Sequence, residues 1–221
     1  MQESAIQIYW VRRIRGADDL EFLKIDDSYL KKHRKIIREN SSIGMGKNGI
    51  VYRIKNNPRL VVKEDQDKMF SWDSIDDEMN AYKKMKLGKE PLFSPSREVK
   101  VSDGNRGIVR PIVRPIFDPN EQHKKYFTPG FTDNLRKTIT QLTYKGYVFG
   151  DGYQLGYDNS KRILQYDLGK LEKINPRDPD ALNHAFRINN FRWQHLGKLI
   201  GKSGKIGRIE QTAQLDKLYL R

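Results

Sequence analysis

Short runs of apolar, mostly β-branched residues alternate with polar stretches in the first half of the chain. Two runs, residues 50–54 (IVYRI) and 59–63 (RLVVK), flank a polar stretch that contains two asparagines and a proline. Runs of this composition are typical of β-strands, and Asn and Pro are typical of turns. The pattern therefore predicts a β-hairpin.

Three glycines, Gly44, Gly46 and Gly49, come just before the first of these strands. Because glycine has no Cβ atom, backbone N–H groups at such positions can approach an oxyanion such as phosphate closely. The predicted order is strand, glycine loop, strand. It differs from the strand, loop, helix order of P-loop and dinucleotide-binding folds, so the glycines do not indicate NAD binding.

A helical period follows Ser74. Four apolar residues recur at helical spacing: Ile75, Met79, Tyr82 and Met85. Ser74 is suited to cap the N-terminus of this helix, with Asp77 three residues later. Glu78 flanks the apolar stripe, so the pattern predicts an amphipathic helix that carries an acidic side chain at the edge of its buried face.

The rest of the chain alternates strands and helices. Residues 97–117 indicate two strands around an Asp-Gly-Asn turn, and residues 133–144 indicate a helix that ends before Gly146. Two short strands are expected in residues 153–157 and 162–166. The C-terminal part predicts one or two helices with four core residues: Leu182, Phe186, Trp193 and Leu196.

Composition limits the classes of function. The 221 residues are enough for one compact domain. The absence of cysteine excludes disulfides, a thiolate nucleophile and Cys-type zinc sites, and the four scattered histidines disfavour a metal hydrolase. No apolar run approaches the roughly 18 residues that span a bilayer. We expect a soluble, cytoplasmic protein without a membrane span.

The formal net charge of +14 is distributed over several short basic clusters. This favours a solvated surface or an acidic partner protein over a nucleic-acid site. The sequence GKSG (201–204) resembles the GxxG loop of RNA-binding KH modules. KH helices have apolar residues six and nine positions after the first glycine, where this chain has Gly207 and Glu210. RNA binding is therefore a lower-ranked alternative.

Residues 44–51 have the pattern GxGxxGxV, and a Val-Val-Lys sequence ending at Lys63 follows. This order resembles the small lobe of protein kinases. The resemblance implies ATP as a substrate, with the three glycines and Val51 around the nucleotide and Lys63 on its α- and β-phosphates. It also implies an acid that pairs with Lys63. Glu78 is expected in that role because of its reach, with Asp76 and Asp77 as competing acids.

The same resemblance extends to a hinge and two acidic motifs. The hinge that binds adenine is expected near residues 113–118, with Arg114 and Ile116 as contacts. Phe149-Gly150-Asp151 is similar to the His-Gly-Asp motif, which implies that Asp151 orients the acceptor hydroxyl. Asp167-Leu168-Gly169 is similar to Asp-Phe-Gly, which implies that Asp167 binds Mg²⁺ or Mn²⁺. Asp158 rivals Asp151 but is expected in the turn between the two short strands.

Two features depart from the kinase pattern. Gly156 stands where the family has the Asn that binds a second magnesium ion, although Gln154 could supply an oxygen ligand instead. After Gly169, no Ala-Pro-Glu sequence closes an activation segment. A one-metal site and a pseudokinase are both consistent with Gly156.

We expect an α+β protein with a reduced two-lobed protein-kinase-like fold. The expected divisions are an N-terminal extension (1–40), a β-rich N-lobe with one αC-type helix (41–117) and a small helical C-lobe (118–221). The chain looks like the minimal kinases of bacteria and phages. This implies a monomeric protein kinase that acts on Ser or Thr, or on Tyr, of a partner or host protein, in the cytoplasm or as a secreted effector.

The alternatives are a pseudokinase that binds an acidic partner, a small-molecule phosphotransferase and an RNA-binding protein. Small-molecule phosphotransferases usually have a larger acceptor-binding lobe than this chain can form.

Overall fold

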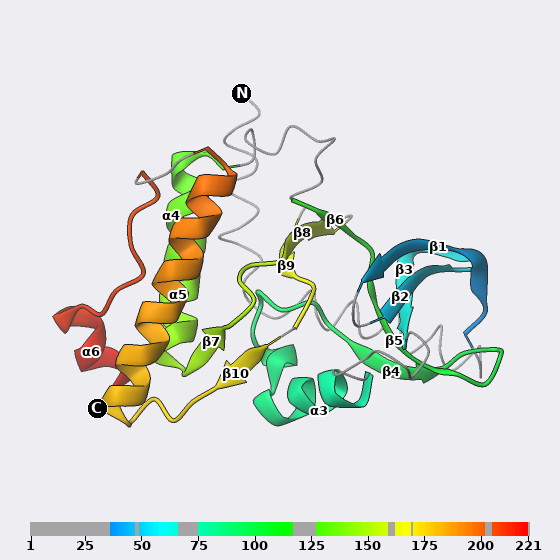
Figure 1. Ribbon diagram of the computed structural model, residues 1–221, viewed down its shortest axis with the longest axis horizontal. Coiled ribbons are helices and arrows are strands. Elements are labelled where there is room, and N and C mark those ends of the chain that lie inside the picture. The colour runs from blue at the N-terminus through cyan, green and yellow to red at the C-terminus, as the bar shows by residue number, and fades with distance from the viewer. Residues whose placement is uncertain are drawn as a thin grey trace. The chain divides into compact units, whose positions relative to one another are not determined.

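Figure 1 shows the computed structural model of the chain. The structure describes residues 36–46, 49–65, 75–116, 127–158, 162–168, 170–201 and 205–220. Backbone contacts divide the chain into two compact units. The first comprises Met1–Arg114 and Gly156–Tyr166, and the second comprises Pro115–Leu155 and Asp167–Arg221. The described chain is mixed α+β, as predicted.

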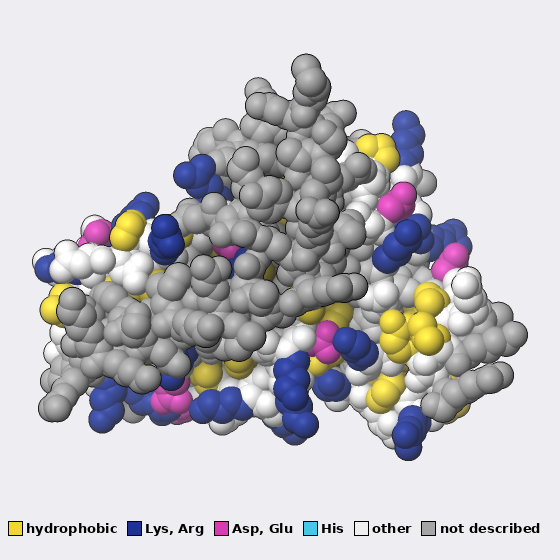
Figure 2. Space-filling model, turned by 180° about the vertical axis from the view of Figure 1, so that it is seen from behind, with side chains coloured by type: hydrophobic (Ala, Val, Ile, Leu, Met, Phe, Trp, Pro, Cys, Tyr) yellow, Lys and Arg dark blue, Asp and Glu magenta, His cyan; other side chains and the backbone are white. Residues whose placement is uncertain are grey.

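The surface carries many basic side chains. On the face seen in Figure 2, Lys and Arg side chains are spread over the described surface, and Asp and Glu side chains are fewer. Among the described helices, none is both long enough and apolar enough to cross a membrane.

A five-stranded antiparallel sheet forms the body of the first unit, with the order β1-β2-β3-β5-β4. Its strands are β1 (Arg38–Gly46), β2 (Gly49–Ile54), β3 (Asn57–Glu64), β4 (Arg97–Lys100) and β5 (Arg106–Pro111). The predicted hairpin is confirmed as β2 and β3, in which Val51 pairs with Lys63. Its turn is tighter than expected. Asn56 adopts a left-handed conformation (φ 64°), and β3 already begins at Asn57.

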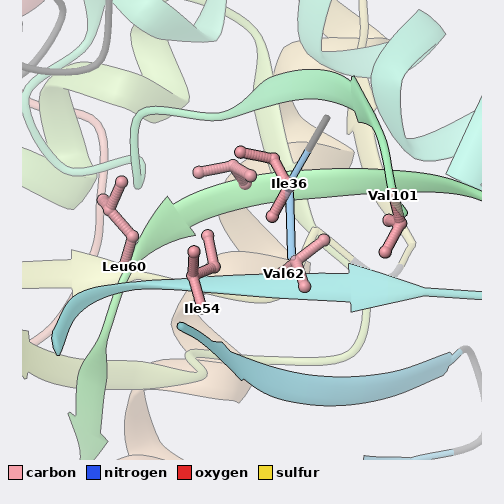
Figure 3. Packing of buried hydrophobic residues seen from close by; sticks show 6 residues of the cluster. Ile36, Ile54, Leu60, Val62 and Val101 are labelled. Atoms are coloured by element: carbon pink, nitrogen blue, oxygen red, sulfur yellow. The ribbon is translucent and has the colours of Figure 1, made fainter. Parts of the chain in front are cut away.

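One face of this sheet is covered by an aliphatic cluster (Figure 3). Its members are Ile36, Ile54, Leu60, Val62, Val101 and Val109. Of the predicted N-terminal extension, residues 1–35 lie outside the described residues. Ile36 belongs to this cluster and bridges to Val101, and β1 begins two residues later.

Helix α3 (Ile75–Met85) packs on the opposite face. Its buried residues Ile75 and Met79 contact Ile108 of β5, which confirms the predicted amphipathic pattern. The expected N-cap, Ser74, lies outside the described residues. The N–H of Ile75 donates to Asp65 Oδ1 at 2.8 Å, so a side chain that follows β3 satisfies a donor of the first helical turn.

After α3 the chain forms a 3-10 turn, η1 (Leu87–Lys89), and later segments form a three-stranded sheet. The sheet has the order β6-β8-β9, from β6 (Val113–Pro115), β8 (Leu155–Asp158) and β9 (Ile163–Gln165). The predicted pair of short strands is confirmed as β8 and β9. Gln165 exchanges backbone hydrogen bonds with Leu92 and Ser94, which ties β9 to the segment after η1.

The second unit is built on two helices that pack together (Figure 1), α4 (Pro129–Tyr144) and α5 (Pro179–Leu199). Strand β7 (Tyr147–Phe149) pairs with β10 (Leu171–Lys173), and α6 (Ala213–Tyr219) follows α5. The C-terminal part therefore contains one long helix and one short helix. The predicted core residues Leu182, Phe186, Trp193 and Leu196 are all buried.

The predicted start of α4 was wrong by four residues. The helix begins at Pro129 rather than Asp133, because Thr128 caps it through a hydrogen bond from the N–H of Phe131 (3.3 Å) and proline suits the first helical turn. The predicted end is confirmed, since α4 stops at Tyr144 and Gly146 has a positive φ of 87°.

Position 156 has no room for a side chain. A Cβ atom on Gly156 would lie 2.9 Å from the Arg114 carbonyl oxygen and 3.1 Å from Val113 Cβ. We expect Gly156→Ala to lower the free energy of unfolding by about 1–3 kcal/mol, because backbone and a β-branched residue would have to move. Gly156→Asn, which introduces the asparagine that the kinase resemblance predicts at this position, should destabilise at least as much. Urea unfolding measures both.

Gly44→Ala is the matched control, because a Cβ atom there meets nothing within 4 Å. A Gly156→Ala variant as stable as Gly44→Ala would contradict the packing argument.

Candidate functional site

A buried carboxylate on α3 is held by two cations of the sheet. Lys63 Nζ donates to Glu78 Oε2 at 2.8 Å, and Arg110 Nη2 donates to Glu78 Oε1 at 2.6 Å. The three side chains are each about one-tenth exposed or less, at 11%, 10% and 7% for Lys63, Glu78 and Arg110. The structure therefore places the sequence-predicted pair Lys63 and Glu78 in direct contact, with both carboxylate oxygens occupied.

The strand register explains this meeting. Lys63 of β3 pairs with Ile108 of β5, and Val61 pairs with Arg110. Directly paired residues share a face of the sheet, as do residues two apart. Lys63, Ile108 and Arg110 thus face α3, where Ile108 packs on the helix and the two cations reach Glu78.

Arg110 was not predicted from the sequence. Its second arm donates from Nη1 to the carbonyl oxygen of Tyr166 at 2.5 Å. Tyr166 immediately precedes Asp167 in the chain. The signal that could have found Arg110 is a charged residue directly after the apolar run GIV in β5.

The charge of Glu78 is stabilised by its neighbours. Burial raises the pKa of this carboxyl group, but the nearby Arg110 and Lys63 charges and hydrogen bonds outweigh burial and lower the pKa from 4.5 to about 2. Asp76 and Asp77, the competing acids, are exposed on the first turn of α3. Asp76 forms an ion pair with Arg106 at 2.6 Å instead.

The glycines lie on a strand pair rather than in a loop ahead of it. Gly44 and Gly46 belong to β1 and pair with Val51 and Gly49 of β2. Gly49 is required by close packing and by its φ of 147°. A Cβ atom there would lie 2.5 Å from the Glu64 carbonyl oxygen and 3.1 Å from Lys63 Cε. The missing side chain of Gly49 thus makes space for the Lys63 side chain.

The predicted hinge residues differ in exposure. Arg114 is exposed, whereas Ile116 is buried and its N–H donates to the Leu155 carbonyl oxygen at 2.8 Å. Residues 117 and 118 lie outside the described residues. The adenine contacts expected of Arg114 and Ile116 stay predictions.

In the second unit, Asp151 lies on a loop that follows β7. Its side chain is 38% exposed, and Lys170 Nζ lies 3.4 Å from its Oδ1 atom. The backbone of Gly150, directly before Asp151, is held by two hydrogen bonds. The N–H of Gly150 donates to the Lys170 carbonyl oxygen at 3.0 Å, and the Arg192 guanidinium of α5 donates to the Gly150 carbonyl oxygen.

Asn189 of α5 anchors the strand that leads into this loop. Its fully buried side chain donates to Thr143 Oγ1 and to the Tyr147 carbonyl oxygen, and accepts from the N–H of Phe149, each at 2.8 Å. Tyr153, on the other side of the loop, donates its hydroxyl to the Asn189 carbonyl oxygen at 2.9 Å. These contacts were not predicted, because an asparagine within a helix gives no local sign of its partners.

Asp158, the rival of Asp151, is engaged in its turn. It is buried and accepts hydrogen bonds from the Arg162 N–H at 2.8 Å and from Arg162 Nε at 2.7 Å. Asp151, by contrast, presents a partly exposed carboxylate. The geometry favours Asp151 for contact with a substrate.

Among the described residues, no group of three or more His, Asp or Glu side chains is arranged to hold a metal ion. Asp167 and Gln154 are half-buried. A carboxylate and an amide oxygen are ligands that suit Mg²⁺, which commonly binds through one or two carboxylates together with phosphate oxygens and water. Binding of Mg²⁺ by Asp167 and Gln154 stays a prediction.

The segment after the GxxG sequence does not continue as a KH helix. Residues 202–204 lie outside the described residues, and residues 205–212 contain no helix. This segment packs on α5, where Trp193 Nε1 donates to the Ile206 carbonyl oxygen at 3.1 Å and the Ile209 N–H donates to Asn190 Oδ1 at 3.0 Å.

No protein-family model matches the chain, and no curated protein matches it. Among solved structures, the chain is similar to the Legionella pneumophila Lpg2603 kinase bound to IP6. The two sequences are 14% identical, the alignment covers 81% of this chain and 67% of that chain, and the TM-score is 0.44.

The lowered pKa of Glu78 predicts a pH-dependent stability. Because the folded protein holds this carboxyl group ionised down to about pH 2, the unfolded chain binds its proton more readily below about pH 4.5. The stabilisation is complete above that pH and is lost as the pH falls towards 2. We expect a loss of about 3 kcal/mol of unfolding free energy over this range in the wild type.

Glu78→Gln should remove that part of the pH dependence, measured by urea unfolding between pH 6 and pH 3. The variant is also less stable at neutral pH because Lys63 and Arg110 lose their carboxylate. The slopes are therefore compared rather than the absolute values. Equal pH slopes in the two proteins would contradict the lowered pKa of Glu78.

Asn189→Ala should destabilise the protein by about 2–4 kcal/mol, because three buried hydrogen bonds are lost around β7. Asn183→Ala, on the exposed face of the same helix, should change the stability by less than about 0.5 kcal/mol. Thermal and urea unfolding of the two variants provide the comparison. A destabilisation in Asn189→Ala no larger than in Asn183→Ala would show that the Asn189 contacts contribute little.

Proposed function

We propose that the chain is an ATP-dependent protein kinase that transfers the γ-phosphoryl group to a hydroxyl of a partner or host protein. The proposal rests on the buried ion pair of Lys63 and Glu78. Lys63 comes from β3, the central strand of the five-stranded sheet, and Glu78 comes from the helix packed on that sheet. This is the arrangement that fixes a lysine over nucleotide phosphates in kinases.

The charge balance of this cluster supports a phosphate ligand. Among the described residues, Lys63 and Arg110 share a single carboxylate, Glu78. Burying a cation without full compensation is costly, and replacing a buried ion pair by apolar residues is often neutral or stabilising. The cluster is therefore better explained by an anionic ligand than by stability. The α- and β-phosphates of ATP supply such charge.

The transfer step assigns a role to each acid. Asp151 accepts the proton of the acceptor hydroxyl, and the hydroxyl oxygen forms a bond to the γ-phosphorus. At the same time the bond between that phosphorus and the β-phosphate oxygen breaks, and ADP leaves. Lys170, beside Asp151, offers a cation to the transferred group. Asp167, with Gln154 as a further oxygen ligand, would hold a magnesium ion, which would neutralise phosphate charge when bound.

A protein acceptor is favoured by the exposure of Asp151. Its carboxylate lies on a loop at the surface of the second unit. A hydroxyl on a macromolecule can therefore approach it without entering a deep pocket. The many basic side chains in Figure 2 favour an acceptor protein with an acidic surface.

A non-catalytic interaction module is the second candidate. It is favoured by Gly156, which lies in β8 where a Cβ atom would meet backbone and side chain. The usual asparagine ligand of a second magnesium ion therefore has no place at this position. Such a module would bind ATP or an acidic partner without transferring phosphate.

Incubation with γ-labelled ATP, Mg²⁺ or Mn²⁺ and a generic protein acceptor tests the proposal. We expect label on protein with the wild type and a loss of about a hundredfold or more in Lys63→Ala, Asp151→Ala and Asp167→Ala. Asp133→Ala, which removes an exposed acid of α4, is the control and should retain the wild-type rate.

Label that persists in the Asp167→Ala variant would remove the proposed metal-binding role. Measurable ATP binding without transfer in the wild type would favour the interaction module.

A further inference from the structure

We propose that Arg110 is a positioning residue for phosphoryl transfer, which holds the Glu78 carboxylate and the backbone before Asp167 in one arrangement. This inference rests on the proposed function. It adds a residue from β5 that neither the glycine, lysine and acid pattern nor the two acidic motifs include.

The guanidinium group of Arg110 has a geometry that suits two acceptors. Its two terminal nitrogens reach two different acceptors, the Glu78 carboxylate at 2.6 Å and the Tyr166 carbonyl oxygen at 2.5 Å. A planar fork with fixed donor directions can satisfy both acceptors at once, whereas a lysine ammonium at the end of a flexible chain has no such preorganised fork. Arg110 thus couples a helix to a loop.

Both partners of Arg110 are themselves anchored. Glu78 is carried by α3, whose residues Ile75 and Met79 pack on the sheet. On the other side, Gln165 is fixed by backbone hydrogen bonds with Leu92 and Ser94. Arg110 completes this restraint at Tyr166, the last residue before Asp167.

Arg110 also supports Lys63. In the proposed reaction the amine of Lys63 binds phosphates while its hydrogen bond to Glu78 holds it in place. Arg110 occupies the other carboxylate oxygen and so fixes the orientation of Glu78. Without Arg110, Lys63 would be the only cation bound to Glu78 among the described residues, and the carboxylate that positions its amine would be less firmly held.

The segment after Leu168 is short. Only Gly169 and Lys170 separate Leu168 from β10, and α5 begins at Pro179. This connection is too short to contain a separate phosphorylated segment that would order Glu78 and Asp167 from outside. Arg110 instead holds Glu78 and the Tyr166 backbone, both of which belong to the first unit.

The test compares Arg110→Met and Arg110→Lys with Arg106→Met. Arg106 lies on the same strand but is exposed and pairs with surface acids, so its loss should leave kinetics unchanged. For Arg110→Met we expect kcat to fall about tenfold or more and KM for ATP to rise several-fold, corrected for the folded fraction from thermal unfolding. Arg110→Lys should recover KM but not kcat.

A cycle with Glu78→Gln separates positioning from a structural role. If Arg110 acts through Glu78, the double variant should bind ATP no more weakly than Glu78→Gln alone, as measured by calorimetry. Additive losses, or kinetics per folded molecule equal to the wild type in Arg110→Met, would overturn the inference.

Calorimetry also distinguishes this failure from failure of the proposed function. A wild-type protein that binds ATP while Arg110→Met binds it equally well would overturn only the role of Arg110. A wild-type protein that binds no ATP would overturn both proposals.

Discussion

The first unit depends on one ionised carboxylate, Glu78, held between Lys63 and Arg110. Each partner comes from a different strand, β3 or β5, and the carboxylate comes from the helix packed across them. The contact therefore exists only when the strand register is correct, since a slip of β3 or β5 by one residue would turn its cation to the aliphatic face. The ion cluster and the hydrophobic packing of α3 thus specify the same arrangement.

The two glycines that matter most act through close packing. Gly49 leaves space for the Lys63 side chain, and Gly156 lets β8 approach Arg114 and Val113. In both cases the absence of a Cβ atom serves the protein's own packing, whatever ligand it binds. At position 156, where kinases have a metal-binding asparagine, the strand has no room for a side chain and so could not carry a metal ligand.

Local patterns predicted the elements well, whereas the tertiary contacts of the site, apart from the Lys63–Glu78 pair, escaped prediction. The hairpin of β2 and β3, the buried stripe of α3 and the core residues of α5 follow from period and turn composition alone. The start of α4 was missed because the Thr128 cap and Pro129 were overlooked. Arg110, Asn189 and Arg192 were missed for a different reason. Their partners lie between 32 and 56 residues away, at Glu78, Tyr166, Phe149 and Gly150, and no spacing rule reports such pairs.

In the second unit, helix α5 holds the loop that bears Asp151. Asn189 and Arg192 bind the backbone of Phe149 and Gly150 ahead of Asp151, and the Tyr153 side-chain hydroxyl beyond it donates to the Asn189 carbonyl oxygen. In each unit, then, a polar side chain of a regular element holds backbone shortly before a proposed functional acid: Tyr166 in the first unit, just before Asp167, and Phe149 in the second, two residues before Asp151. Arg110 does this from a strand and Asn189 from a helix. Because both donors are buried, neither restraint depends on solvent or on a modification at the surface.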